Sequence, residues 1–177
     1  DFGNKFGQPL ITGSVLTFEH TENGEQYGYD KVIMLAGGVG YGTRRDCLKG
    51  TPQKGNKVVV VGGDNYRIGL GGGSVSSVET GRYSSGIELN AVQRANPEMQ
   101  KRANNLVRAL CEEEVNPVVS IHDHGSAGHV NCLSELVEEC GGRIDMAALP
   151  IGDPTLSAKE IIANESQERM GLLIQEE

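Results

Sequence analysis

The chain has 177 residues, 37% of them hydrophobic, and a formal net charge of −8. A chain of this length suits one domain that buries roughly 70% of the surface of its unfolded state. Because nucleic acids and membrane surfaces attract basic proteins, the acidic balance argues against both as partners. The sequence contains no signal peptide and no apolar run long enough to span a bilayer.

The four cysteines form no C-x-x-C pair, so we expect a reduced, cytoplasmic protein whose thiols serve as small apolar side chains. The chain begins at Asp1 instead of Met and stops at Glu177 directly after an apolar run. We therefore expect a piece of a longer polypeptide, with an N-terminal arm or edge segment over 1–30 and a single domain over 31–177.

The first sixty residues predict short strands and turns. A β-like segment around 14–18 and the apolar run KVIMLA at 31–36 indicate strands, and the second should end at the following Gly37 and Gly38. Residues 57–61 contain four consecutive valines, which suit a strand that is buried on both faces.

A glycine-rich loop, GLGGGS at 69–74, follows this strand. Its residues Gly71, Gly72, Gly73 and Ser74 can present several backbone N–H groups and a hydroxyl to one anion, such as a phosphate. The same residues are equally typical of a tight strand connection that binds nothing. Both interpretations stay open at this point.

A dinucleotide-binding interpretation of this loop is not favoured. The Rossmann fingerprint places G-x-G-x-x-G directly after a strand and at the start of a helix. Here Ser74 stands where the third glycine belongs, and residues 62–68 separate the loop from its strand. The serine-rich stretch that follows is not an obvious helix, so we disfavour an NAD-linked oxidoreductase.

The second half of the chain predicts helices that alternate with strands. Asn96 is a favoured N-cap, Pro97 suits the first helical position, and the helix should stop near Glu114 because Asn116-Pro117 imposes an extended backbone. The further elements expected are a strand over 118–121, a helix over 130–140, a strand over 144–148, a capping-box helix over 157–162 and a strand over 169–174. This alternation predicts a layered α/β (α+β) domain with a mixed β-sheet and helices packed on it.

The loop 122–129 joins a strand to a helix, which is where α/β domains bind ligands. Asp123 can hold a hard cation such as Mg²⁺, or it can cap the turn or helix that follows. The histidines of this loop support zinc only weakly, because no cysteine joins them and the spacing of zinc ligands is absent.

A second polar group, Glu165, Ser166 and Gln167, lies between a helix and a strand. A carboxylate, a hydroxyl and an amide can bind the hydroxyls and amides of a small polar ligand, although such a run is also typical of a solvated turn. Gln93 stands alone before the predicted helix. The ligand-site hypothesis requires positions 93, 123 and 165–167 to converge on one pocket.

Six motifs, taken in order, resemble one family. They are FGNKFGQPL at 2–10, MLAGG at 34–38, GLGGGS at 69–74, VQR at 92–94, His122-Asp123 with Gly125, and NESQER at 164–169. Together they resemble phosphoribosylformylglycinamidine synthase, also called formylglycinamide ribonucleotide amidotransferase, in its large single-chain form. The resemblance covers essentially the whole chain.

The resemblance implies the C-terminal-type domain of an AIR-synthase-like unit, the first of two in the full enzyme. The family converts formylglycinamide ribonucleotide, ATP and glutamine into formylglycinamidine ribonucleotide, ADP, phosphate and glutamate in purine biosynthesis. It thereby implies Mg²⁺ and ATP, the remaining domains of the enzyme and a glutaminase domain as partners. Self-association of the isolated piece is a further expectation, because this domain packs against a homologous one in the family.

Carried over residue by residue, the resemblance implies that Gln93, Glu165, Ser166 and Gln167 contact the substrate and that Asp123 binds magnesium. It also implies that the glycine loop lies near the phosphate of the substrate. The family's catalytic histidine, most of its ATP ligands and its glutaminase cysteine have no counterpart here, so the isolated piece should be inactive.

Two alternatives remain. One is another enzyme of the same superfamily, such as AIR synthase, a selenophosphate synthetase or a thiamine-phosphate kinase. The other is a non-catalytic scaffold or interdomain packing module.

One departure from the family is the bulk of His124 and His129, which replace small residues in the loop 122–129.

Overall fold

The computed structural model describes residues 11–29, 35, 37–79, 81–93, 96–166 and 168–176. Its elements, in chain order, are β1 (Glu19–Glu22), β2 (Glu25–Gly28), the 3₁₀ turn η1 (Arg44–Asp46), β3 (Lys57–Val61), α2 (Gly72–Ser76), α3 (Ser85–Ala91), α4 (Pro97–Glu112), β4 (Val118–Asp123), α5 (Gly128–Leu136), the 3₁₀ turn η2 (Met146–Ala148), α6 (Ala158–Ile162) and β5 (Met170–Ile174). No helix among these residues is long and apolar enough to cross a membrane.

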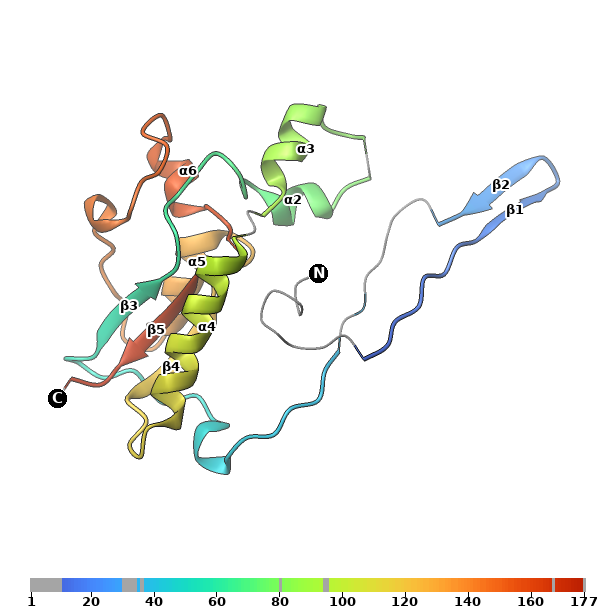
Figure 1. Ribbon diagram of the computed structural model, residues 1–177. Coiled ribbons are helices and arrows are strands. Elements are labelled where there is room, and N and C mark those ends of the chain that lie inside the picture. The colour runs from blue at the N-terminus through green and yellow to red at the C-terminus, as the bar shows by residue number, and fades with distance from the viewer. Residues whose placement is uncertain are drawn as a thin grey trace.

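A three-stranded sheet in the order β3-β5-β4 forms the centre of the domain (Figure 1). The layered α/β class is confirmed, but the pairing of the described strands is antiparallel throughout, where a mixed sheet was predicted. The reason is topological. β3 and β4 run in the same direction, and β5 enters between them from the opposite end, so both of its ladders are antiparallel.

The apolar sequence of β5 explains its central place. Leu172 and Leu173 are almost fully buried, and Leu173 joins a cluster with Cys132, Leu133 and Leu136 of α5. Burial also raises the pKa of the Cys132 thiol to about 12, so this cysteine behaves as a small apolar side chain. The four cysteines are free, as the sequence predicts.

The valine strand β3 is less buried than predicted. It lies at the edge of the sheet, and Val58 keeps 44% of its surface exposed. Val60 packs against the core cluster, but no other strand pairs with the outer side of β3 within the described residues. A run of valines therefore identified the strand correctly and its position in the sheet wrongly.

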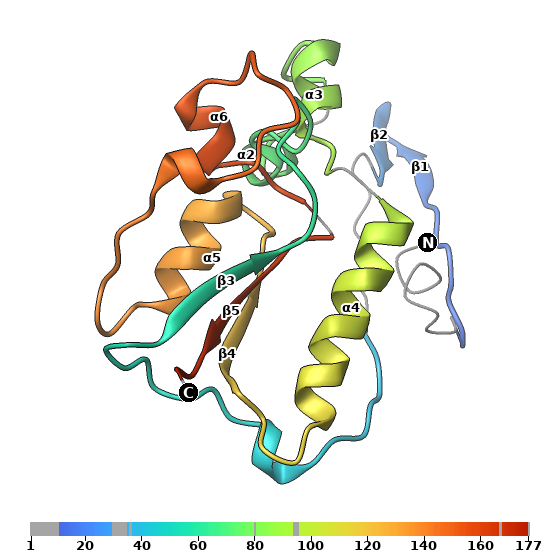
Figure 2. The same ribbon diagram turned by 60° about the vertical axis from the view of Figure 1, so that its left-hand side comes forward.

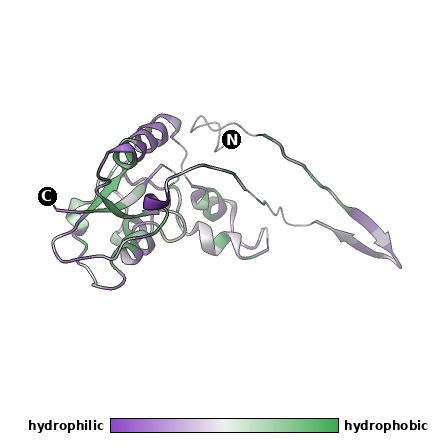
Figure 3. Cartoon of the chain, turned by 90° about the horizontal axis from the view of Figure 1, so that it is seen from below, coloured by the Kyte–Doolittle hydropathy of each residue, from purple (hydrophilic) through white to green (hydrophobic). Residues whose placement is uncertain are grey.

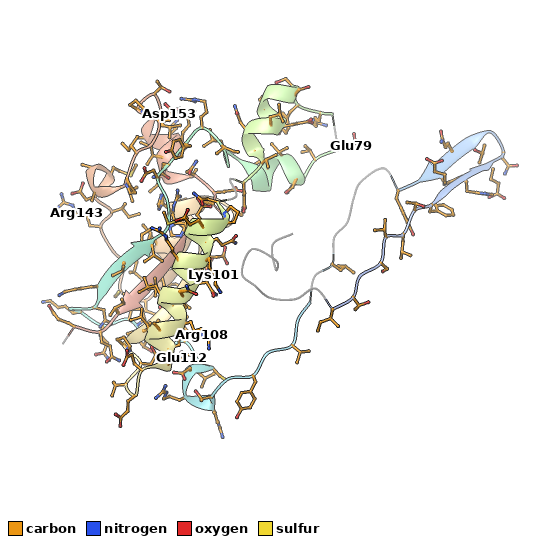
Figure 4. All side chains as sticks on the ribbon, in the orientation of Figure 1. Glu79, Lys101, Arg108, Glu112, Arg143 and Asp153 are labelled. Atoms are coloured by element: carbon orange, nitrogen blue, oxygen red, sulfur yellow. The ribbon has the colours of Figure 1, made fainter. Side chains whose placement is uncertain are left out.

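Helices α4 and α5 lie on opposite faces of the sheet, as the two views show (Figures 1 and 2). The predicted start of α4 is confirmed, because the side chain of Asn96 accepts a hydrogen bond from Met99 N at 3.1 Å and Pro97 opens the helix. Its charged side chains Lys101, Arg108 and Glu112 line the helix in Figure 4. The helix ends at Glu112, close to the predicted end.

Helix α5 begins earlier and ends earlier than its predicted range of 130–140. Ala127 and Gly128 adopt positive φ values of 62° and 54°, which ends the preceding loop and starts the helix at Gly128. The chain leaves the helix after Leu136, and residues 137–141 form a turn in which Gly141 N donates to Val137 O.

Three other predictions change. The strand around 14–18 is replaced by the hairpin β1–β2, whose turn Asn23-Gly24 has positive φ at both residues, as a two-residue hairpin turn requires. The strand over 144–148 is replaced by η2, because the side chain of Asp145 accepts from Ala147 N and closes a tight turn. The stretch after the glycine loop is helical. The predicted strand at 31–36 lies almost entirely outside the described residues.

Hydrophobic and hydrophilic segments are separated along the chain. In Figure 3 the strands of the central sheet are hydrophobic and the β1–β2 hairpin is hydrophilic. The hairpin lies away from the central sheet, and the segments that flank it expose large apolar side chains such as Ile11, Val15 and Leu16.

Candidate functional site

One end of the central sheet brings the predicted site segments together. Val61, the last residue of β3, and Asp123, the last residue of β4, both pair with Met170, the first residue of β5. The chain that leads from β3 to the glycine loop, the loop 122–129 after β4 and the polar run at 164–168 before β5 therefore all meet this end of the sheet. This arrangement places the candidate site beyond the carboxyl ends of β3 and β4.

The glycine loop packs directly on the polar run. Glu165 N donates to Gly69 O at 2.8 Å, and Leu70 forms a bridge with Asn164. Gly69 has a φ of +74°, and a Cβ at this position would run into the carbonyl oxygen of Glu165. Glycine is therefore required here both by backbone conformation and by close contact.

The carboxylate of Glu165 joins three separate segments. Its Oε1 accepts from Gly73 N at 3.4 Å and from Ala127 N at 3.2 Å, and its Oε2 accepts from Gln93 Nε2 at 3.2 Å. Only 3% of Glu165 is exposed. The structure thus brings Gln93 and Glu165 into contact, with Ala127 of the loop 122–129 on the same carboxylate.

Ser166 follows Glu165 in the chain and is 2% exposed. Its backbone N–H donates to His124 O at 3.1 Å, which attaches the polar run to the loop after β4. Its hydroxyl is buried and has no hydrogen-bond partner in the described part of the chain. Gln167, the third residue of the predicted group, lies outside the described residues.

Asp123 lies at the same end of the sheet, but no hydrogen bond described joins it to Gln93 or Glu165. Its Oδ1 accepts from Gly125 N at 2.7 Å, and the side chain is exposed. Ser126, three residues on, lies against Gly73 of the glycine loop. The Asp123 loop is therefore joined to the glycine loop, while its carboxylate faces solvent.

The donor set fits a hard cation only in part. Among the described residues no group of three or more His, Cys, Asp or Glu side chains could hold a metal ion. A single exposed carboxylate with one oxygen outside its turn is nevertheless what Mg²⁺ uses when waters and ligand phosphates complete its shell. The turn-capping interpretation of Asp123 is visible in the bond to Gly125 N.

The glycine loop itself forms the start of a short helix. Gly71 has a φ of +71° and precedes α2, so the loop is a helix start and not a simple strand connection. The N–H of Gly73 already points to the Glu165 carboxylate. A protein carboxylate thus takes one of the donors that the sequence had suggested for a phosphate.

Sequence reasoning missed a buried polar network beneath the site. His124 Nε2 lies 3.0 Å from His129 Nδ1, and His129 Nε2 lies 3.0 Å from Asn65 Oδ1 and 3.1 Å from Arg169 Nη1. Arg169 Nη1 also donates to Asn164 O at 3.0 Å. Each of these five residues is at least 98% buried.

This network connects the strand ends. The Arg169 guanidinium donates to the backbone carbonyls of Gly63 and Asp64, directly after β3. The side chain of Asn164 donates to the carbonyls of Tyr66 and Ile68, both at 2.8 Å. The loop after β3 is thereby fixed to the polar run that carries Glu165.

The two histidines are held neutral. Burial, with the nearby His129 and Arg169 charges, lowers the pKa of His124 from 6.5 to about 2. Burial and then the Arg169 charge lower the pKa of His129 to about 4. Their side chains are fully buried and fill the interior under the loop.

The sequence indicates the position of some members of the network but not their inward orientation. Asn164 and Arg169 bracket the polar run, and Asn65 follows a strand, but nothing local indicates that these side chains turn inward. Their partners are far away in sequence, so the network becomes visible only when the sheet is assembled.

Comparison with known proteins agrees with this picture. The family model described as "AIR synthase related protein, C-terminal domain" matches residues 53–177. Phosphoribosylformylglycinamidine synthase from Dictyostelium discoideum is 43% identical over 182 residues, covering 100% of this chain and 13% of the relative. The protein of the same name from Homo sapiens is 41% identical, covering 98% of this chain and 13% of the relative.

Among solved structures, T. maritima PurL complexed with FGAR matches with a TM-score of 0.68 at 22% identity, covering 98% of this chain and 28% of that chain. At this identity the match shows the fold alone. The chain spans about an eighth of the curated relatives it matches. The predicted resemblance is confirmed by these relatives, and the chain belongs to the family of AIR synthase related proteins, whose C-terminal domain it contains.

Proposed function

We propose that this chain is a substrate-binding domain of an ATP- and glutamine-dependent ligase that converts formylglycinamide ribonucleotide into formylglycinamidine ribonucleotide. The observation that carries the proposal is sequence identity of 40–43% along essentially the whole chain to four relatives. Each carries phosphoribosylformylglycinamidine synthase in its name, and they come from a slime mould, a plant, a human and a nematode. The reaction would then belong to purine biosynthesis in the cytoplasm.

The substrate binds, in this proposal, at the end of the sheet where Gln93, Glu165 and Ser166 lie, and Gln167 is the fourth residue assigned to it from the sequence. Contact between Gln93 and Glu165 supports a common location, although these residues are 72 positions apart. The hydroxyl of Ser166 supports it as well, because a buried polar atom without a partner is costly unless a water or ligand satisfies it. In this proposal the four groups together bind and orient the substrate, either by contact or through a neighbour that they hold in place.

Asp123 is the residue of this chain that would bind Mg²⁺. The cation would neutralise negative charge on the transferred phosphoryl group. The glycine loop 71–74 would lie near the phosphate of the substrate. The ATP site, the glutaminase domain and the remaining domains lie outside this chain, so the domain alone has no synthase activity. The boundary between an arm at 1–30 and a domain at 31–177 remains part of the proposal.

The exposed apolar side chains before β3 support packing against another part of the longer enzyme. Ile11, Val15, Leu16, Leu35 and Val39 each expose more than three quarters of their surface. Burial of such side chains is favourable, so we propose that this segment docks on the remaining domains or, in isolation, on a second copy. Sedimentation of the isolated chain over a range of concentrations tests the self-association.

The test is calorimetric titration of the chain with formylglycinamide ribonucleotide. We expect weak binding, a loss of heat in Gln167→Ala, and unchanged binding in the exposed hairpin variant Gln26→Ala. Equal heats for Gln167→Ala and the parent would remove Gln167 from the site. No binding by a folded parent chain would count against the proposal, as would product release by the chain alone with ATP, substrate and ammonia.

Magnesium is tested separately. Adding Mg²⁺ should strengthen binding of the phosphorylated substrate by the parent and not by Asp123→Asn. Asp145→Asn is the matched control, because Asp145 also accepts a backbone hydrogen bond in an exposed turn and no hydrogen bond described joins it to the site residues. An equal Mg²⁺ effect in parent and Asp123→Asn would remove Asp123 as the ligand.

A further inference from the structure

The side chain of Gln93 is held in one orientation by its neighbour. Gln93 Nε2 lies 3.2 Å from Glu165 Oε2. The other oxygen of this carboxylate, Oε1, already accepts from Gly73 N and Ala127 N. Two backbone donors from separate segments therefore fix the carboxylate, and its remaining oxygen is directed at Gln93.

The chemistry of the two groups decides which end of the amide faces the carboxylate. An ionised carboxylate only accepts hydrogen bonds, whereas a glutamine amide has a donor end and an acceptor end. The NH₂ group of Gln93 must therefore face Glu165, and the carbonyl oxygen Oε1 must face the other way. In the described part of the chain this oxygen accepts no hydrogen bond, and the side chain is only half-buried.

Glu165 itself is poorly placed to contact a ligand. It is 3% exposed, and its carboxylate is surrounded by Gly72, Gly73, Ala127 and Gln93. A Cβ on Gly72 would collide with the Glu165 carboxylate, so the loop backbone closes over it. Any influence of Glu165 on the ligand must pass through the residues that it holds.

We propose that Glu165 is a positioning residue that fixes Gln93 with its carbonyl oxygen toward the ligand, so that the site selects a ligand group that donates a hydrogen bond, a hydroxyl or an amide N–H. The inference rests on the proposed function, since formylglycinamide ribonucleotide carries both kinds of donor. It changes the role of Glu165 from a direct contact to control of the polarity of Gln93.

The test uses the isosteric variant Glu165→Gln. The new side chain keeps an oxygen for Gly73 N and Ala127 N, but it presents an NH₂ group to Gln93. Gln93 then turns its carbonyl oxygen toward position 165 and presents its NH₂ group to the ligand. This NH₂ group faces the hydroxyl or N–H donor of the ligand, and the two cannot form a hydrogen bond. We expect the dissociation constant for formylglycinamide ribonucleotide to rise by about ten- to a hundred-fold, as unpaired polar groups at a site require, with little change in thermal midpoint.

The double variant Gln93→Glu with Glu165→Gln is the decisive measurement. In this exchange the new amide at position 165 donates to the new carboxylate at position 93, whose second oxygen again faces the ligand as an acceptor, at unchanged net charge. Affinity should return to within a few-fold of the parent. Gln93→Glu alone should weaken binding, because it places two carboxylates face to face. Glu88→Gln is the control, since Glu88 also accepts a backbone N–H nearby but does not touch Gln93.

A readout without substrate separates this inference from the proposed function. In an isotope-labelled chain, the NH₂ protons of Gln93 should show magnetisation transfer to protons of Gly72, which lies against Glu165 Oε2, and lose it in Glu165→Gln. Presence of this signal with no substrate binding would refute the proposed function alone. Retention of the signal in Glu165→Gln, parent-like affinity in that variant, or a folded exchange variant without recovered affinity would each overturn the positioning role.

Discussion

Acid should destabilise this chain before most of its carboxyl groups titrate, because His124 and His129 are buried in neutral form. Their pKa values in the folded state are about 2 and about 4, below the ordinary value of 6.5. Between these limits the unfolded chain binds more protons than the folded chain. The stabilising effect of the neutral pair is therefore complete above pH 6.5 and is lost as the pH falls below it.

The magnitude follows from these values. On lowering the pH from 7 to 5, each histidine becomes protonated in the unfolded state and remains neutral in the folded state. Each should reduce the free energy of unfolding by about 2 kcal/mol, so that the pair accounts for about 4 kcal/mol. This is a large part of the 5–15 kcal/mol that is typical of a folded domain.

The assay is urea unfolding of the chain at pH 7 and pH 5. In His129→Gln the difference in unfolding free energy between pH 7 and pH 5 should fall to about half that of the parent, whatever the absolute stability of the variant. If His129→Gln does not fold, His124→Gln takes its place. His20→Gln, in the exposed hairpin, is the control and should behave as the parent. The contact between His122 and Glu135 is present in every variant, so it does not affect the comparison.

Other titrating groups act in a different pH range. The pKa values of Asp46, Asp153 and Glu160 are lowered, chiefly by hydrogen bonds to Asn116, Thr155 and Ser157 respectively. Lowered carboxyl pKa values give stability that is present above about pH 4 to 4.5 and lost only below it. An unfolding free energy that is the same at pH 7 and pH 5 in the parent would refute the argument about the buried histidines.

Three further predictions concern stability and can be measured by thermal or urea unfolding. Gly72→Ala should lower the free energy of unfolding by about 2 kcal/mol or more, because its Cβ meets a backbone carbonyl at 2.8 Å as well as a carboxylate. Gly71→Ala should lower it by about 1 kcal/mol, for its positive φ alone. Equal losses in the two variants would contradict this. Asn164→Ala removes two hydrogen bonds to backbone carbonyls and should cost about 2–4 kcal/mol, with Asn131→Ala as the milder control. Ser157→Ala breaks a capping box and should cost about 1 kcal/mol; an unchanged midpoint would show that the cap is unimportant.

Features that depend on neighbouring residues were predictable from the sequence. Asn96 and Pro97 predicted the start of α4, and Ser157 with Glu160 predicted the capping box of α6. In each case the side chain and the backbone group that it satisfies lie within three residues. The chemistry is complete inside one turn of helix, so no knowledge of the fold is needed.

Features that depend on distant residues were not predictable. The exposure of Val58 depends on whether another strand lies beside β3, which the valine run cannot show. The inward orientation of His124 depends on His129, Asn65 and Arg169, the last of which is 45 residues further on in the sequence. The convergence of Gln93 with Glu165 was predicted as a hypothesis, but the bond between their side chains was not.

Two sequence-based hypotheses assign different partners to one backbone N–H group at this end of the sheet. The glycine loop was interpreted as a phosphate site, and Glu165 as a ligand contact, yet Gly73 N already donates to Glu165. A phosphate oxygen on the same N–H would lie within about 4 Å of the carboxylate, where two unit charges repel by about 4 kcal/mol at an effective dielectric of 20. Phosphate binding at Gly73 therefore requires Glu165 to move or a cation to stand between the two anions. Since Glu165 is held by donors from two other segments as well, a phosphate that binds without such a change must use donors other than Gly73 N.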